Sequence, residues 1–438
     1  MSHGIDRRKF LAGVGSAAIL GVAGCTGGGG GDGEETTTEE TTESGDGEQT
    51  TESGGSSRST PLKYGVLQPV TGDLGSVGKP IRNAGILPAK QLEGADLGGL
   101  SIDMQQEDTQ TSPQAGISAA NALVNAGYPA VVGAASSGVS TQVAKQVFIP
   151  SQVVACSPAS TAPSLTNLDD NDFFFRTAPS DALQGQVMAQ VAAEQLEAST
   201  AATMYVNNDY GQGLSQSFTN AFEGDQGGTV QTQVSFEKQK SSYTSKLQSA
   251  LSDGPDTLII IGYPASGTQM FKDYYADFGD GTQILVTDGL KDPKMQKQIG
   301  NPMENVTGTA PQSGGPNADA FNQLYKDEYG EEPGVFTAHA YDAAAVLLLA
   351  NARAGENSGP AIADNMRNVA DGGTEIGPDN LAEGIRMAAN GEDVNYQGAS
   401  SAIKFDENGD VVGVAFDVWK FAPDTESGIE ITDTVTFG

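Results

Sequence analysis

Short apolar segments alternate with helical patterns through most of this chain of 438 residues. Several of these segments carry almost no polar residue, which is typical of strands buried on both faces. They span residues 64–68, 130–132, 153–155, 202–206, 258–261 and 284–286. Strands of this kind, separated by helices, form a parallel sheet that helices cover on both sides. The sequence therefore predicts an α/β fold, and the region from about residue 61 to residue 438 is long enough for two lobes.

The clearest predicted helix follows the first of these apolar segments. Ser112 and Pro113 open it, because serine favours the N-cap and proline the first helical turn. One face of the helix carries its apolar residues, which are Ile117, Ala120, Leu123 and Val124. We expect this helix to end at Gly127, and we expect another helix over residues 337–352.

The C-terminal region has a hairpin pattern. Apolar residues 402–405 and 411–419 flank Asn408 and Gly409, and an Asn-Gly pair between apolar runs favours a tight turn. Asp406, Asn408 and Asp410 also have the alternate spacing of a calcium loop. However, such a loop needs glycine where this chain has valine, and glutamate at its last position where it has aspartate. We therefore interpret the segment as a turn and expect no metal.

The N-terminal region is typical of an exported, lipid-anchored protein. Arg7 and Arg8 precede an apolar run that ends in small residues directly before Cys25, as in a twin-arginine signal with a lipoprotein cleavage site. The run is shorter than the roughly 20 residues that span a bilayer. We expect residues 1–25 to be the signal, with lipid on Cys25, and residues 26–60 to be an acidic, disordered stalk. The folded part would then lie at the outer face of the cytoplasmic membrane.

The charge of the chain is strongly negative. Lys and Arg number 23 against 56 Asp and Glu, which gives a formal charge of −33. Such a surface repels itself in dilute buffer, and concentrated salt screens that repulsion, so we expect a halophilic source. Binding to nucleic acid is not expected, because phosphate requires a basic patch and no cluster of Lys and Arg occurs beyond the signal.

The residues needed for common enzyme chemistry are scarce. Apart from Cys25 the chain has one cysteine, Cys156, which follows an apolar run and is interpreted as a buried small hydrophobe. Apart from His3 it has one histidine, His339, for which we expect a hydrogen-bonded structural role. No Gly-x-Ser-x-Gly motif, dinucleotide fingerprint or zinc-ligand spacing is present. We therefore expect a protein that is not an enzyme and has no cofactor.

The loops that follow six predicted strands are rich in hydroxyl groups, glycine, and aromatic or acidic residues. They comprise residues 72–75, 133–141, 157–161, 208–211, 262–264 and 287–289. Ligands of open α/β sheets bind at the carboxyl ends of the strands, where these loops lie. Hydroxyls and backbone N–H groups bind a carboxylate, Asp288 could pair with an ammonium group, and Tyr210 and Tyr263 could contact an apolar side chain. This set describes a pocket for a free amino acid.

From about residue 62 to its C-terminus the chain resembles the extracytoplasmic substrate-binding proteins of ABC importers, in particular the branched-chain amino acid (Leu/Ile/Val) binding group. Short matches keep their order along the chain, at residues 67–72, 108–109, 132–141, 157–163, 175–177, 209–211, 340–343 and 405–409. The resemblance implies a type I periplasmic-binding-protein fold, with two doubly wound parallel-sheet lobes joined by a three-segment hinge. The first lobe would comprise residues 61–178 and 309–398, and the second residues 179–308 and 399–438.

The resemblance also implies roles for the loop residues. In similar proteins, hydroxyl residues of the second and third loops hold the α-carboxylate, a role that falls on Ser137 or Ser136 and on Ser160 and Thr161. The second loop is one residue longer than in the best-known relatives, which leaves the choice between the first two serines open.

The aromatic residue of the fourth loop and the acid of the sixth would receive the α-amino group. These are Tyr210 and Asp288, with Tyr263 alongside. Relatives often have glutamate at the acidic position, so the shorter Asp288 could change the ligand or admit a water.

The implied function is capture of a small amino acid, with branched-chain side chains favoured, and its delivery to ABC permease and ATPase subunits. Two alternatives stay open. The ligand could be urea, a short amide or an aromatic acid, which other members of the family bind. The protein could instead be a ligand-sensing surface lipoprotein that acts with a signalling partner. We expect a monomer, the usual state in this family.

Overall fold

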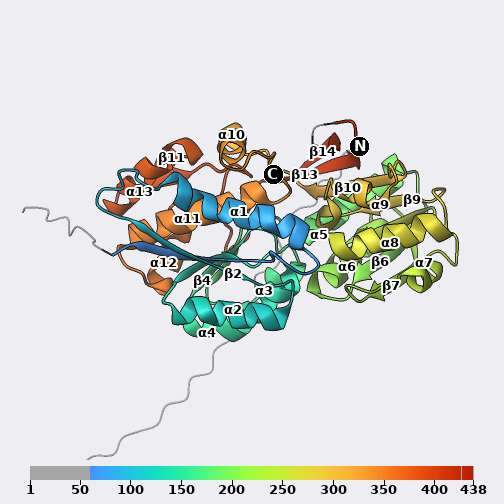
Figure 1. Cartoon of the computed structure of the whole chain (residues 1–438), viewed down its shortest axis with the longest axis horizontal. Helices are drawn as coiled ribbons and strands as arrows, with labels where there is room; N and C mark the ends of the chain where they lie inside the picture. Colours follow the sequence, from blue (N-terminus) through green and yellow to red (C-terminus); the bar gives the residue numbers. More distant parts are fainter. Residues whose placement is uncertain (1–59, 426, 438) are drawn as a thin grey trace, which may run out of the picture. The chain divides into compact units, whose positions relative to one another are not determined.

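The computed structural model describes residues 60–425 and 427–437 (Figure 1). Arg7, Arg8, the lipid site Cys25 and all but the last residue of the expected stalk lie outside the described residues. The export signal, the anchor and the stalk therefore stay predictions. Among the helices in the described part of the chain, none has the length and apolarity that crossing a bilayer requires.

The first lobe is built on a five-stranded parallel sheet with strand order β2-β1-β3-β4-β5. Its strands are β1 (Leu62–Gln68), β2 (Ile102–Asp108), β3 (Ala130–Gly133), β4 (Val154–Ser157) and β5 (Phe174–Arg176). Successive residues of each strand point to opposite faces, so Val66 and Leu67 belong to two different apolar clusters. Burial on both faces explains why β1, β3, β4 and β5 contain few polar residues.

Helices cover both faces of this first sheet. Figure 1 shows α1 (Gly75–Gln91) and α11 (Thr337–Ala354) on one side, and α2 (Pro113–Asn125) and α3 (Ser137–Val143) on the other. The remaining helices and strands of this lobe are α4 (Ile149–Ser151), α10 (Ala318–Tyr329), α12 (Gly359–Met366), α13 (Leu381–Ala389), β11 (Thr374–Ile376) and β12 (Val394–Tyr396). Cys156 lies fully buried in the core, as expected, and burial raises the pKa of its thiol.

The second lobe is built on a seven-stranded sheet with strand order β14-β13-β10-β9-β8-β6-β7. Its parallel strands are β6 (Thr200–Val206), β7 (Thr229–Phe236), β8 (Thr257–Ile261), β9 (Gln283–Val286) and β10 (Val306–Pro311). Two antiparallel strands, β13 (Val414–Phe421) and β14 (Ile429–Phe437), extend it at one edge. Its helices are α5 (Asp181–Gln190), α6 (Asp209–Gly224), α7 (Thr244–Ala250), α8 (Pro264–Asp277) and α9 (Met295–Ile299).

The α/β class and the parallel sheets predicted from the apolar runs are confirmed. Sequence analysis missed β2, β7 and β14, which lie at sheet edges and are partly exposed, so that they carry many polar residues. It also missed the buried strands β5 and β10. The predicted helix after Ser112 is present as α2, with Ser112 in extended conformation before it.

The predicted C-terminal hairpin is present only close to its turn. Phe405 and Val411 form an antiparallel bridge, Asp406 N donates to Asp410 O and Val412 N donates to Lys404 O, but residues 402–404 form no strand. The second run instead forms β13, which pairs with β10 on one side and β14 on the other. This strand is almost entirely buried, so two neighbours in a large sheet satisfy its backbone and cover its side chains better than a short hairpin would.

The lobe limits implied by the resemblance stay a prediction, but two segments refine them. Strand β10 runs through the expected limit at residues 308 and 309, and it lies wholly in the second sheet. The crossover back into the second lobe precedes β13, and its residues still contact β5 of the first lobe: Arg176 N donates to Gly409 O over 3.0 Å. At Gly409 a Cβ would lie 2.6 Å from Phe174 O, so this close approach requires glycine.

The Asp406–Asp410 segment is a turn, as we interpreted it. The Asp406 Oδ1 atom accepts hydrogen bonds from the backbone N–H groups of Asn408 and Asp410. Asp410 itself forms a two-pronged ion pair with the fully buried Arg176, at 2.5 Å for Nε to Oδ1 and 2.6 Å for Nη2 to Oδ2. This pair fixes the crossover to the first lobe.

Replacing one member of that pair leaves a buried guanidinium without its carboxylate. We expect Asp410→Asn to lower the free energy of unfolding by about 3 kcal/mol in urea denaturation. The matched control is Asp371→Asn, which removes an ion pair with Lys404 whose two side chains are 67% and 57% exposed. That control should cost less than about 1 kcal/mol. Equal, small losses in both variants would contradict the role given to Asp410.

Candidate functional site

A pocket lies where the carboxyl ends of the strands of both sheets meet, and each of the six predicted loops contributes to it. Its lining from these loops consists of Leu74, Ala135, Ser137, Ala159, Tyr210, Tyr263, Asp288 and Gly289. Four further lining residues come from outside the loops: Val77, Ile81, Val335 and Phe336. The lining residues, and not the size of the cavity, indicate what this site could bind.

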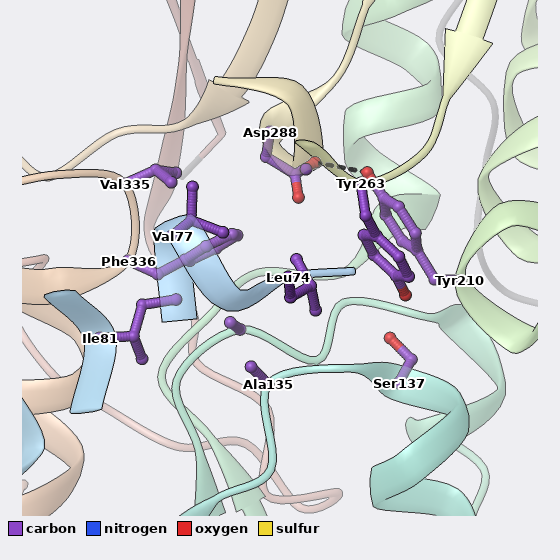
Figure 2. Close-up of a pocket in the computed structure, with 12 residues that line it drawn as sticks. Leu74, Val77, Ile81, Ala135, Ser137, Tyr210, Tyr263, Asp288, Val335 and Phe336 are labelled. Carbon is purple, nitrogen blue, oxygen red and sulfur yellow. Dashed lines mark hydrogen bonds between the residues drawn. The ribbon is translucent and has the colours of Figure 1, made fainter. Parts of the chain in front are cut away.

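Figure 2 shows that the lining is divided by polarity. The apolar side chains of Val77, Val335 and Phe336 gather on one side, and the tyrosine pair, Asp288 and Ser137 lie on the other. A ligand with one apolar and one charged part would match this division.

The structure separates the two serines between which the sequence left a choice. The Ser137 side chain lines the pocket, and its Oγ accepts a hydrogen bond from the Ala162 N–H group over 3.2 Å. Its hydroxyl proton thus stays free to donate to a ligand. Ser136 Oγ instead lies 3.1 Å from the Tyr263 hydroxyl, so this serine joins the second loop to the second lobe.

The third loop contributes less of its side chains than we expected. The Ser160 hydroxyl is fully buried against the second loop, within hydrogen-bond distance of Ala134 O, Ala135 O and Ser140 Oγ. It supports the loop and does not line the pocket. Thr161 is buried next to Asp181 and lowers the pKa of that carboxyl, yet its hydroxyl makes no hydrogen bond of normal geometry within the described part of the chain.

The two predicted tyrosines form one wall of the pocket. Their rings stack with centroids 5.6 Å apart and an angle of 10° between planes. Tyr210 donates to Asp288 Oδ1 over 3.2 Å and lies 2.7 Å from Thr287 Oγ1. Tyr263 accepts a hydrogen bond from Asn208 Nδ2. Burial raises the pKa of both phenols, so they stay neutral donors and acceptors at neutral pH.

Asp288 is buried at the pocket beside a second buried acid that sequence analysis missed. Burial raises the pKa of Asp288 to about 6, against the lowering effect of hydrogen bonds from Gln184 and Tyr210. Asp181, in the first turn of α5, is fully buried, and burial followed by the charge of Asp288 raises the pKa of its carboxyl well above the usual range. An acid at the start of a helix is an ordinary stabilising feature, so nothing in the sequence marked Asp181 as a neighbour of Asp288.

The apolar part of the lining was also missed. Leu74, Val77 and Ile81 come from the start of α1, where they resemble any buried helix face. Phe336 precedes α11 with a φ of 62°, a left-handed conformation that is uncommon for an aromatic residue. Such conformations are concentrated at binding sites, and this one places the ring in the pocket.

His339 does not belong to the lining. It is buried in α11, and burial, together with the charge of Lys291, lowers its pKa to about 3. The ring is therefore neutral at physiological pH. Its Nδ1 atom finds no hydrogen-bond partner in the described residues, so the expectation of a hydrogen-bonded role is not met at this atom.

Residues 61–388 match the family model described as periplasmic binding protein. Since the match covers most of the chain, this protein belongs to the periplasmic binding protein family. Its two α/β lobes with parallel sheets are the type I fold that the resemblance implied.

The chain is similar to three better-described proteins. BasB of Halobacterium salinarum, a chemotactic signal transduction system substrate-binding protein, is 25% identical over 353 residues, covering 78% of this chain and 83% of BasB. The leucine-, isoleucine-, valine-, threonine- and alanine-binding protein of Pseudomonas aeruginosa is 25% identical over 375 residues, covering 84% and 92%. The crystal structure of a leucine-binding protein from Thermotoga maritima matches with a TM-score of 0.71 at 26% identity, covering 85% of this chain and 98% of that one. These relatives are binding proteins and not enzymes, as we expected for this chain.

The raised pKa of Asp288 makes the stability of the ligand-free protein depend on pH. Its folded pKa, about 6, lies above the ordinary 3.8, so its contribution to stability is full below about pH 4 and is lost as the pH rises through 6. Asp288→Asn avoids this loss. We expect the variant to gain about 3 kcal/mol in unfolding free energy over the wild type between pH 4 and pH 7.

Urea unfolding of both ligand-free proteins at the two pH values measures this gain. Asp280→Asn, at an exposed position of the same lobe, serves as the control and should show no such pH dependence. A difference between Asp288→Asn and wild type that is the same at both pH values would contradict the burial argument.

Proposed function

We propose that this protein is a solute receptor that captures a free amino acid between its two lobes, with leucine, isoleucine and valine favoured. The observation that carries the proposal is the buried acid Asp288, which lines a pocket whose other side is apolar. Its charge also acts on a second buried acid, Asp181, which lies outside the lining. Hydroxyl groups of the first lobe that can donate to a carboxylate also support the proposal.

The buried Asp288 favours a ligand that carries a positive charge. Burial raises the pKa of both carboxyls, and the charge of Asp288 raises that of Asp181 further. An ammonium group bound at Asp288 would favour the ionised form of this acid. Urea, short amides and aromatic acids carry no positive charge that could compensate a buried carboxylate. Asp288 therefore supports an amino acid over these alternatives.

The first-lobe loops offer donors for the carboxylate of the same ligand. Ser137 has a free proton on a hydroxyl that already accepts a backbone hydrogen bond. The Thr161 hydroxyl is buried beside Asp181 and lies outside the lining, so Ser137 is the donor to which we assign the carboxylate. A hydrogen bond from such a group to a charged carboxylate contributes about 1.5–3 kcal/mol.

The apolar side of the pocket fits a branched aliphatic side chain. Leu74, Val77, Ile81, Val335 and Phe336 are all hydrocarbon side chains without a polar atom to recognise a polar ligand group. Burial of a leucine-sized side chain against them contributes about 1.5–3 kcal/mol. This wall, together with the names of the Pseudomonas and Thermotoga relatives, supports the branched-chain preference.

Delivery of the ligand to ABC permease and ATPase subunits, from a lipid anchor on Cys25, is the downstream step of this proposal. The similarity to BasB favours a second role, in which the closed protein reports to a signalling partner. Both roles need the same captured ligand. Cellular uptake of labelled leucine and the chemotactic response to it are the two assays that separate them.

The amine assignment predicts a large effect of Asp288→Ala. Removal of this carboxylate should weaken the binding of leucine by about 2–5 kcal/mol, because the ammonium loses its partner in a buried site. Isothermal titration calorimetry in molar salt with leucine, isoleucine, valine, urea, acetamide and benzoate measures it, with Asp280→Ala as the control. Unchanged leucine affinity in Asp288→Ala would refute the amino acid proposal. Binding of only urea, acetamide or benzoate by the wild-type protein would also refute it.

The two neighbouring serines should differ in their contributions. Ser137→Ala removes a hydroxyl that can donate to the ligand, so we expect leucine affinity to fall by about 1.5–3 kcal/mol. Ser136→Ala removes only a hydrogen bond to Tyr263, and a loss of at most about 1 kcal/mol is expected. The same titration measures both variants, and the reverse order of losses would assign the carboxylate to Ser136.

A further inference from the structure

One side chain of the first lobe is hydrogen-bonded to the start of a helix in the second lobe. Asp73 follows β1 in the first loop and is 2% exposed. Its Oδ1 atom accepts from the backbone N–H of Ser266 over 3.1 Å and from the Ser266 hydroxyl over 2.8 Å. The Asp73 carbonyl oxygen accepts from the N–H of Ala265 over 3.3 Å. Ala265 and Ser266 lie in the first turn of α8.

Helix α8 lacks a cap from its own lobe. Pro264 is its first residue and has no N–H group, and the preceding Tyr263 makes no capping hydrogen bond with its side chain within the described chain. The next two N–H groups of the first turn, at Ala265 and Ser266, are those directed at Asp73. A carboxylate at this position also interacts favourably with the helix dipole. The first lobe thus supplies what an N-cap residue normally supplies.

Both partners are held in place within their own lobes. On the first-lobe side, the Leu74 N–H donates to Thr111 Oγ1, and Thr111 O accepts a second cross-lobe hydrogen bond, from Lys238 Nζ. On the second-lobe side, Ser266 Oγ accepts from the N–H of Gln239. The contact therefore joins two fixed segments.

We infer that Asp73 is a positioning residue for ligand capture, which stabilises the closed arrangement of the lobes by capping α8 and makes no contact with the ligand itself. The residues next to the contact on either side, Leu74 and Tyr263, line the pocket. When the lobes separate, the N–H groups of α8 and the Asp73 carboxylate pass to water. Ligand escape then requires the cap to break. The inference rests on the proposed function only in that a ligand closes the lobes.

The test is the rate of leucine dissociation in Asp73→Ala, measured by stopped-flow fluorescence. We expect dissociation to become at least about tenfold faster, with association nearly unchanged, since most affinity differences of related complexes lie in the dissociation rate. Asp73→Asn keeps an oxygen that can accept from Ser266 and should restore part of the effect. The melting temperature of the ligand-free variant should stay close to that of the wild type, because the cap joins the two lobes and is not part of the core of either.

The control is Asp256→Ala. Asp256 Oδ2 accepts backbone hydrogen bonds from Ser199 and Thr200 within the second lobe, at the strand ends opposite the pocket. Its loss should lower the melting temperature and leave leucine dissociation unchanged. If Asp73→Ala behaves like this control, Asp73 is merely structural and the inference is wrong.

A second measurement does not depend on the ligand being leucine. Spin labels on Lys79→Cys and Lys272→Cys, at exposed positions of α1 and α8, report the distance between the lobes in a chain with Cys25→Ser. The buried Cys156 is protected from labelling. Asp73→Ala should shift the distance distribution toward longer values, and an unchanged distribution would overturn the inference even if every tested ligand failed to bind.

Discussion

The buried guanidinium of Arg176 is the interaction on which the arrangement of the site depends. Besides its ion pair with Asp410, it donates through Nη1 to Ala162 O over 3.0 Å, in the loop that carries Thr161. One side chain therefore connects β5, the third loop and the crossover that leads into β13. A charge buried to this degree is stable only when every partner is present. The position of the ligand loop and the path of the hinge are consequently set together.

Most of the fold could be predicted from the sequence, because strands buried on both faces leave continuous apolar runs. The edge strands β2, β7 and β14 were missed because they are partly exposed, and the buried β5 and β10 because they are short or rich in small and hydroxyl residues. The hairpin near residue 408 is shorter than predicted, because local turn chemistry does not reveal which distant strand competes for pairing. The pocket, too, could be predicted only in part. All six loops after the strands contribute to it, since parallel topology brings their ends together. Asp181 and Phe336 depend on tertiary packing and had no sequence signal.

The site also shows that residues of one short motif can have different tasks. Ser136 and Ser137 are neighbours, yet one is bonded to Tyr263 across the pocket and the other lines it. Ser160 donates a hydrogen bond to the second loop, which carries Ser137, and so supports that loop. The resemblance in sequence indicated segments that contribute to the pocket, whereas the direction of each side chain decides which residues line it.

The contacts that join the lobes across the pocket mouth are largely short hydrogen bonds within a buried environment, at Asp73 with Ser266 and at Ser136 with Tyr263. Salt at 1 M limits electrostatic interactions between exposed charges to about 3 Å, but it acts weakly on buried groups. The highly acidic surface will therefore change its self-repulsion with salinity, while the closing contacts keep their strength. Capture and release of the ligand would then depend on the ligand concentration and not on the salt concentration.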